Sequence, residues 1–366
     1  MQNKETLKNS PRTIRHITSI AAFEDLRYSW NALLEKKHIR SAVLTWEWLF
    51  SWWKVFGDEK KLWLVTVWED DRLIGVAPLM LEKRRKIGMP LQVLCTLGTP
   101  MNDIGGFIVQ DQDLQIVKIL SDFILEQKRE WDIFELNEFP VEGLEISVLK
   151  DIFSQRNFRL IEENNEHYYI PVEGSWDDYY SSLSKKFRKN LRRAERNSAG
   201  LGNVFLKQYS GNGLTWGNFD EAIAVNCHAN YPRICHSKKE QAFLKELFEL
   251  APQWLTLYLL FINDEAVAYE YGFLYQNRFE DWRAGFDTRI DPAISIGKFI
   301  ALKVLEKSFE DGLKEVDFMR GAHAYKQEWR PETRIYTQLR FFKRQSPKAM
   351  IAYLGLEKIK PLLRRF

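Results

Sequence analysis

A stretch of four residues in the second half of the chain could hold a phosphate group. It consists of Ser295, Ile296, Gly297 and Lys298, and it begins a helix-patterned run after the loop TRIDPAISIG. The first turn of a helix offers unpaired backbone N–H groups and the positive end of the helix dipole. The stretch therefore predicts a site for a phosphate-bearing cofactor. The alternative is an ordinary N-cap followed by a tight turn.

The residues around this loop resemble a known family. They read as a strand at 278–286, the loop, a helix, a strand at 314–319 and the segment GAHAYKQEW. This order is similar to the C-terminal half of the CelD-like branch of the GNAT acetyltransferases, which is associated with exopolysaccharide and cellulose biosynthesis. The matching pieces are Gly285-Phe286-Asp287, Ser295-x-Gly297, Gly312, Asp317-Phe318, Arg320-Gly321 and Tyr325-Lys326-x-x-Trp329.

The resemblance extends through most of the chain, roughly from Trp46 to Trp329. It implies that acetyl-CoA is the acyl donor, with its pantetheine arm between splayed strands 278–286 and 314–319 and its pyrophosphate at the Ser295–Lys298 turn. The sequence departs from the branch at His323, where an acidic residue is common.

Three residues are candidates for the proton transfers of acyl transfer, which needs an uncharged nucleophile and an acid for the leaving thiolate. Glu270 lies in an otherwise apolar strand, and histidine is the residue type suited to proton transfer near neutral pH, so Glu270 and His323 are both candidate bases; Tyr325 is the candidate proton donor. Strand alternation also permits Glu270 to face solvent. Asp281 and Asp287 are reserve acids, which we expect to pair with Arg283 and Arg289.

Five residues are candidates for binding the acceptor. Lys326 and Trp329 join a cation to an aromatic surface, which suits a phosphate or a sugar. The helix pattern 185–196 places apolar residues on one face and seven basic residues around the other. That surface predicts an anionic acceptor, such as a nucleotide-linked sugar, a lipid-linked saccharide or tRNA, or else a solvated helix face. The five candidates are Arg188, Arg192, Arg283, Lys326 and Trp329.

The two halves of the chain repeat one order of elements. Helices precede an apolar hairpin in each half, LVTVWEDDRLIGVAP at 64–78 and YLLFINDEAVAYEYG at 258–272. The first half has no counterpart of the Ser-x-Gly-Lys turn. We therefore predict an α/β fold with a mixed sheet, built as tandem GNAT-like units at 1–172 and 173–366, with the cofactor in the second. The helix that follows the boundary should run over 176–198 from a cap at Ser175.

Composition narrows the class of protein. The chain has 366 residues, a formal charge of +3 and 45% apolar residues, which describes a globular protein and not a strongly basic DNA-binding one. Its three cysteines are irregularly spaced, so we expect no disulfide, no metal and a reducing, cytoplasmic location. No run is long enough to cross a bilayer. The tail from Lys348 should cap the second unit.

These observations predict an acyl-CoA-dependent N- or O-acetyltransferase that acts on a sugar, a polysaccharide precursor or another envelope-related acceptor. One alternative keeps the tandem fold and changes the donor: Fem-type peptidyltransferases also pair two GNAT-like units and use aminoacyl-tRNA. The basic helix favours that alternative, whereas the Ser-x-Gly loop favours CoA. A further alternative is a ligand-binding protein of this fold without catalysis.

Overall fold

The chain forms two compact units. The computed structural model describes residues 11–36, 41–86, 88–110, 113–321 and 323–356. Unit 1 comprises 1–53, 57–164 and 336–366, and unit 2 comprises 54–56 and 165–335. No helix within the described ranges has both the length and the apolar character needed to cross a bilayer.

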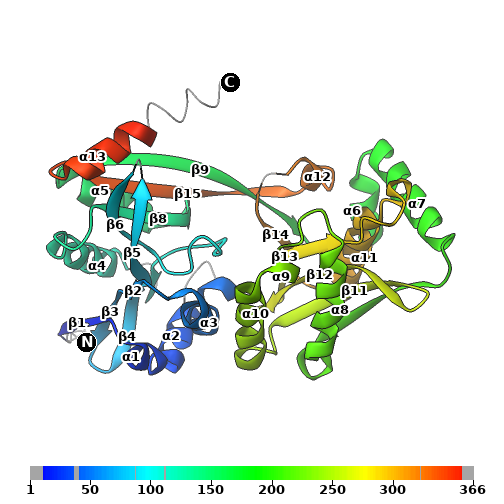
Figure 1. The fold of residues 1–366 in the computed structure, drawn as a ribbon, viewed down its shortest axis with the longest axis horizontal. Coiled ribbons are helices and arrows are strands. Elements are labelled where there is room, and N and C mark those ends of the chain that lie inside the picture. The colour runs from blue at the N-terminus through cyan, green and yellow to red at the C-terminus, as the bar shows by residue number, and fades with distance from the viewer. Residues whose placement is uncertain (1–10, 37–40, 87, 111–112, 322, 357–366) are drawn as a thin grey trace, which may run out of the picture. The chain divides into compact units, whose positions relative to one another are not determined.

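Unit 1 is an α/β unit with two sheets (Figure 1). One sheet has the order β1-β3-β4-β7, and the other contains the run β15-β8-β6-β5-β2. The elements are β1 (Arg12–Ile17), α1 (Ile20–Glu24), α2 (Arg27–Leu34), α3 (Trp46–Phe56), β2 (Lys61–Leu62), β3 (Leu64–Glu69), β4 (Arg72–Ala77), β5 (Leu79–Lys86), β6 (Met89–Thr96), β7 (Ile108–Val109), α4 (Leu114–Glu126), β8 (Ile133–Pro140), α5 (Leu144–Gln155), β9 (Phe158–Pro171), β15 (Glu332–Lys343) and α13 (Pro347–Leu354). Strands β9 and β15 each contribute residues to both units.

Unit 2 is built on the strand order β10-β11-β12-β13-β14-β9. Helices α7 and α11 pack on one face of this sheet, where Phe187 and Phe299 join a core with Tyr258 and Phe279. Helix α8 packs on the other face, where Phe219 contacts Tyr271. The elements are α6 (Trp176–Ser182), α7 (Lys185–Ala199), β10 (Val204–Ser210), α8 (Trp216–Cys227), α9 (Arg233–His236), α10 (Lys238–Leu250), β11 (Leu255–Ile262), β12 (Glu265–Tyr275), β13 (Arg278–Phe286), α11 (Ile296–Glu310), β14 (Glu315–Arg320) and α12 (Ala324–Gln327).

The predicted repeat is present in the strand pairing. Strand β1 pairs with β3 and β3 with β4, as β10 pairs with β11 and β11 with β12, all antiparallel. Strand β6 is parallel to β8, as β13 is parallel to β14. In unit 1 the strand that corresponds to β12 is interrupted at Pro78, between β4 and β5. Proline has no N–H to donate to a ladder, which accounts for the split into two sheets.

Three expectations about the elements differ from the structure. The predicted helix 176–198 is two helices, because Leu183 is extended and Ser184 caps α7 by accepting a hydrogen bond from the N–H of Phe187. The C-terminal part from Tyr336 belongs to unit 1, since β15 pairs there with β8. The tail helix α13 therefore packs on unit 1, where Tyr353 contacts Phe342, and does not cap unit 2.

The expectation of no disulfide is wrong, because Cys227 and Cys235 form one. The chain reverses between α8 and α9 and brings their Cα atoms to 5.2 Å, although eight positions separate them in the sequence. The sequence argument for a reducing compartment therefore loses its basis. Cys95 is free and buried.

Candidate functional site

Strands β13 and β14 run side by side for a short distance and then separate. Their parallel pairing includes Arg278 with Glu315 and ends at Glu280 with Asp317. The start of the pair is fixed by Arg278, which donates to Glu315 at 2.6 Å. Beyond Asp317 the strand β14 is irregular, and Met319 has a φ of 55°. A positive φ is rare for a residue other than glycine and re-aims the end of the strand.

Helix α11 begins beside this separation with an uncapped first turn. Ser295 is the N-cap in the left-handed conformation, and its side chain makes no cap hydrogen bond. Its carbonyl accepts from the N–H groups of Lys298 and Phe299, so those of Ile296 and Gly297 have no partner among the described residues. A Cβ at position 297 would come within 2.8 Å of the Phe286 ring. The turn thus has two free donors at the positive end of a helix.

The fourth residue of the predicted phosphate turn contacts two other elements. The ammonium group of Lys298 forms an ion pair with Glu328 at 2.7 Å. The same group lies 5.2 Å from the centroid of the Phe187 ring on α7. Lys298 therefore connects the start of α11 to α7 and to the residue that follows α12.

Glu270 is buried on the face of the sheet that α7 and α11 cover. It lies opposite Tyr258 of β11 in the ladder and is 5% exposed. Its carboxyl group has no hydrogen bond or ion pair among the described residues. Burial, and then the neighbouring charge of Asp281, raise the pKa of Glu270 well above its ordinary value. The surface placement that strand alternation allowed is thus excluded.

Asp281 lies on the same face of the adjacent strand. Asp281 lies two positions after Phe279 in β13, so both side chains point to the same side of the sheet. The ring of Phe279 packs against Tyr258 on that side. Its Oδ1 atom is buried without a hydrogen-bond partner. Burial raises the pKa of Asp281 to about 6. The expected pairing with Arg283 is absent among the described residues, because Arg283 donates to the carbonyl of Trp282 and stacks on its ring.

Tyr325 lies within electrostatic reach of both carboxyl groups. The residue as a whole is 53% exposed. Burial around the hydroxyl, and then the charges of Asp281 and Glu270, raise the pKa of Tyr325 above its ordinary value. The ring of His323 is exposed and stacks on Tyr325 with a centroid distance of 6.0 Å. The structure thus gathers Glu270, Tyr325 and Asp281, and leaves His323 in solvent beside Tyr325.

The remaining acceptor candidates differ in accessibility. Lys326 is buried, and its ammonium group donates to the carbonyl of Phe318 at 2.7 Å. It therefore holds the end of β14, and its charge lowers the pKa of Asp281 against the effect of burial. Trp329 is 1% exposed and packs edge-on against Phe187, so its ring belongs to the core and cannot stack on a sugar.

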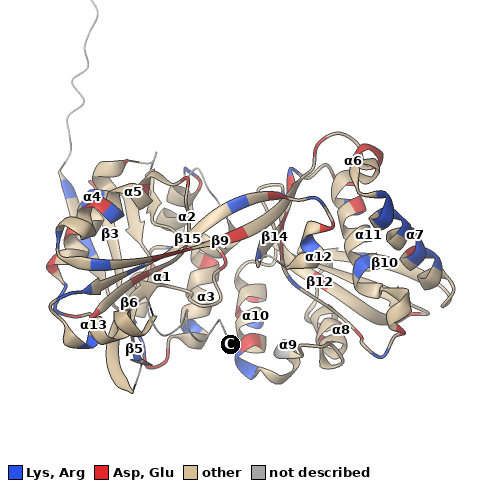
Figure 2. Ribbon diagram, turned by 90° about the horizontal axis from the view of Figure 1, so that it is seen from above, with Lys and Arg blue, Asp and Glu red and all other residues tan. Residues whose placement is uncertain are grey.

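Helix α7 presents the strongest basic surface of unit 2 (Figure 2). Arg188 is half-buried, whereas Arg192 is exposed. Glu195 is the one acidic residue of the helix, and Lys303 already neutralises it at 2.9 Å. The exposed basic residues are Lys185, Lys186, Lys189, Arg192, Arg193 and Arg196. Their spacing places them on one stripe along the helix.

The corresponding place in unit 1 is closed. Helix α4 has its N-terminus capped by Asp113, which accepts from the N–H of Gln115 at 2.8 Å. Beyond the parallel pair Cys95 and Glu135, the N–H of Gly105 donates to the carbonyl of Glu138. A Cβ at Gly105 would lie 2.0 Å from the carbonyl oxygen of Asn137, so the loop lies directly on β8.

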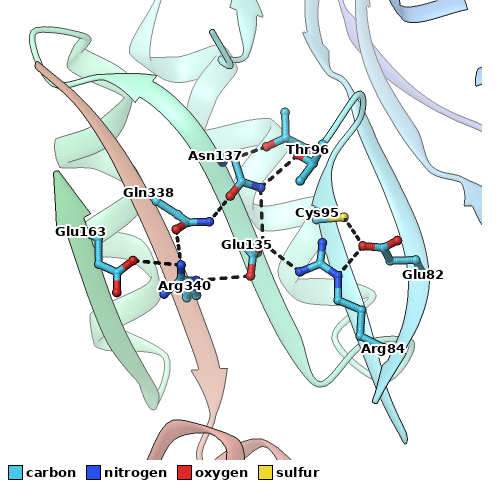
Figure 3. A network of polar contacts seen from close by, with 10 residues as sticks. Glu82, Arg84, Cys95, Thr96, Glu135, Asn137, Glu163, Gln338 and Arg340 are labelled. Carbon is cyan, nitrogen blue, oxygen red and sulfur yellow. Dashed lines mark hydrogen bonds and ion pairs between the residues drawn. The ribbon is translucent and has the colours of Figure 1, made fainter. Parts of the chain in front are cut away.

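A polar network covers the same sheet of unit 1 (Figure 3). Glu135 is its centre, because Arg84 donates to it at 2.9 Å and Arg340 lies 3.4 Å from it. Arg340 also donates to Glu163 at 3.1 Å. These carboxylates have cationic partners, unlike Glu270 in unit 2. Buried charges are stable when each has a partner of opposite charge, so this network has the character of a structural cluster.

The topology defines two GNAT-like units in tandem, the fold of acyltransferases. Residues 185–327 match the family described as the acetyltransferase (GNAT) domain. The fold also resembles the crystal structure of FemX, with a TM-score of 0.58, 11% identity and coverage of 89% of this chain and 96% of that chain. A second likeness is L-PGS from Bacillus licheniformis, with a TM-score of 0.53, 12% identity and coverage of 90% and 96%.

A conserved protein of unknown function from Bacteroides thetaiotaomicron VPI-5482 is also similar, with a TM-score of 0.55, 14% identity and coverage of 90% of this chain and all 100% of that chain. At these identities the likeness concerns the fold alone. A search of curated protein sequences gave no significant match.

Proposed function

We propose that this protein is an acyl-CoA-dependent acyltransferase whose donor binds unit 2. The observation that carries the proposal is the place where β13 and β14 separate, beside the free N–H groups of Ile296 and Gly297. A pyrophosphate at that turn would receive hydrogen bonds and the positive end of the helix dipole. The corresponding place in unit 1 is closed, which supports a donor site in unit 2 only. In this proposal Ser295 and Lys298 shape the turn.

The residues around the turn supply the proton transfers of the reaction. The nucleophile of the acceptor attacks the thioester carbonyl, forms the new bond to the acyl carbon and gives its proton to Glu270. The carbon–sulfur bond breaks, and the thiolate takes a proton from Tyr325. Tyr325 keeps its proton at neutral pH, which is the state that a proton donor needs, whereas Glu270 must first lose the proton that burial favours. His323 is the remaining candidate base.

The resemblance to the CelD-like branch suggests acetyl as the acyl group and a sugar or another envelope-related acceptor. The stripe on α7 supports an acceptor that carries negative charge, because six exposed basic side chains attract anions. Arg192 lies on this stripe, and Arg188 lies beside it. Arg283 remains a candidate contact for the acceptor.

Titration of the purified protein with acetyl-CoA by calorimetry tests the donor site. Gly297→Asp should abolish binding, because it adds a negative charge where the backbone must approach an anion. Gly297→Ala separates charge from bulk: its methyl group meets only the partly exposed Phe286 ring, which can turn away. Gln115→Asp places the same charge at the same position of α4 and should leave binding unchanged. Unchanged affinity in folded Gly297→Asp contradicts the assignment.

The basic stripe on α7 favours one alternative, a Fem-type transferase that takes its acyl group from aminoacyl-tRNA. Nucleic acid would bind a linear array of cations through its phosphates, with a strong dependence on salt. The same calorimetry distinguishes the two donors. Binding of aminoacyl-tRNA together with no detectable binding of acetyl-CoA would support the alternative.

A further inference from the structure

The two carboxyl groups on β12 and β13 are neighbours because a glycine stands between them. Gly272 lies directly opposite Asp281 in the ladder. A Cβ at position 272 would meet the Glu280 carbonyl at 1.8 Å, so only glycine fits. No β12 side chain therefore lies beside Asp281, and the next residues on that face are Leu274 and Glu270. Diagonal positions of this kind are about 7 Å apart and within reach of long side chains.

The surroundings of this pair are poor in compensating charge. Tyr258 faces it from β11, Tyr325 and Lys326 from the α12 segment, Asp317 from β14 and Arg283 from β13. Lys326 is the cation that acts most on Asp281, but its ammonium group is held by the carbonyls of Phe318 and Arg320. Two cations face three carboxyl groups there. Two ionised carboxylates so close in a buried place repel each other.

We infer that Asp281 is a positioning residue for the reaction proposed above: it shares one proton with Glu270 at neutral pH and thereby sets the pH above which Glu270 accepts a proton. Asp281 carries the charge and Glu270 the proton, so activity depends on removing that proton. Asp281 touches no substrate in this account and acts only through Glu270. The inference rests on the proposed function, but the proton sharing is measurable without any substrate.

The activity test is the pH dependence of kcat/KM. Wild type should have an acidic limb, since Glu270 must lose its proton. Asp281→Asn keeps the shape of the side chain and removes the like charge, so the limb should move about one pH unit downward. Asp287→Asn is the matched control, because Asp287 is paired with Arg289 and not with Glu270. A limb that Asp281→Asn leaves in place overturns the inference.

The second test measures Tm against pH and needs no substrate. Burial raises the pKa of Asp281 from 3.8 to about 6, so folded protein holds a proton that the unfolded chain has released between these values. Stability is therefore lost as pH rises through about 6. Asp281→Asn removes this loss, so its Tm should exceed that of wild type above pH 6 and approach it near pH 4. Asp287→Asn should behave oppositely, because Arg289 lowers the pKa of Asp287.

These outcomes separate the two claims. If no acyl transfer is found but the two Tm profiles differ as described, the raised pKa of Asp281 stands and the proposed function fails. If activity is present while the limb and the Tm profile of Asp281→Asn follow wild type, the pair is refuted and the function remains. Glu270→Gln should leave this loss of stability in place, because burial of Asp281 is its main cause and Glu270 carries no charge in this pH range.

Discussion

Glu270 and His323 are both candidates for the general base, and the two side chains differ in burial. Glu270 is 5% exposed without a hydrogen-bond partner among the described residues, whereas His323 is exposed. Loss of a positioned base costs about 10²-fold to 10⁴-fold in rate. Glu270→Gln should therefore lower kcat by about 10²-fold or more, and His323→Ala by less than about tenfold. Steady-state measurement of kcat for the two variants distinguishes the two candidate bases. A larger loss with His323→Ala would return the base role to that residue.

At the residue scale the sequence could name Glu270 but not its partner. An acidic residue in an apolar strand is visible in the sequence, and alternation leaves its face open. The partner depends on which residue of β13 lies opposite Gly272, and a bulge after Tyr271 sets that register. A pattern along one strand does not contain a bulge between two strands. Trp329 shows the same limit, because the core contact with Phe187 joins distant parts of the chain.

The exposed stripe on α7 leads to a prediction about the acceptor. Replacing Lys189, Arg192 and Arg193 with Gln should raise the KM of an anionic acceptor several-fold and leave acetyl-CoA affinity unchanged. Added salt should mimic the change, because it screens exposed charges. A matched control replaces Lys238, Lys239 and Lys245 of α10, which are also exposed, and should not change this KM. If neither salt nor the α7 variant changes the KM of the acceptor, the stripe is a solvated surface without a role in binding.

The disulfide leads to a second prediction about elements. It closes a short loop between α8 and α9, and Asn226 beside it accepts from the N–H of Cys235 and donates to the Tyr269 hydroxyl. Replacing Cys227 and Cys235 with Ser should lower the free energy of unfolding by about 2 kcal/mol, since the open chain gains entropy when unfolded. Denaturant unfolding measures the loss. Reductant should lower the free energy of unfolding of wild type by the same amount and leave that of the variant unchanged. An effect of reductant on both proteins would show that the loss does not come from this disulfide.

Element identity was predictable where periodicity and caps agree. The strand β13 at 278–286 illustrates this, as does the cap at Ser175, which accepts from the N–H of Asp178. The break between α6 and α7 was missed, because apolar spacing continues through Leu183 while the hydroxyl of Ser184 competes for the backbone. The disulfide was missed because it depends on a chain reversal that cysteine spacing does not reveal.

At the scale of the whole molecule, the order of elements was predictable and the assignment of strands to units was not. The repeat of hairpin, parallel strand pair and intervening helix follows from local patterns in both halves. The boundary of units at 172 does not, because each unit is completed by a strand shared with the other. Residues 167–171 of β9 pair with β14, and residues from Tyr336 in β15 pair with β8. Such pairings are far apart in sequence, and no local pattern specifies them.

This exchange of strands predicts which fragment of the chain can fold. A fragment of residues 165–335 keeps the pairing of β9 with β14 and the whole core of unit 2, so it should unfold cooperatively. A fragment of 173–366 has the predicted boundary, but it exposes the edge of β14 and carries most of β15 and α13 without β8. An unpaired edge favours aggregation. Thermal unfolding by circular dichroism, with light scattering, compares the two; a cooperative, monomeric 173–366 fragment would contradict the assignment of these strands.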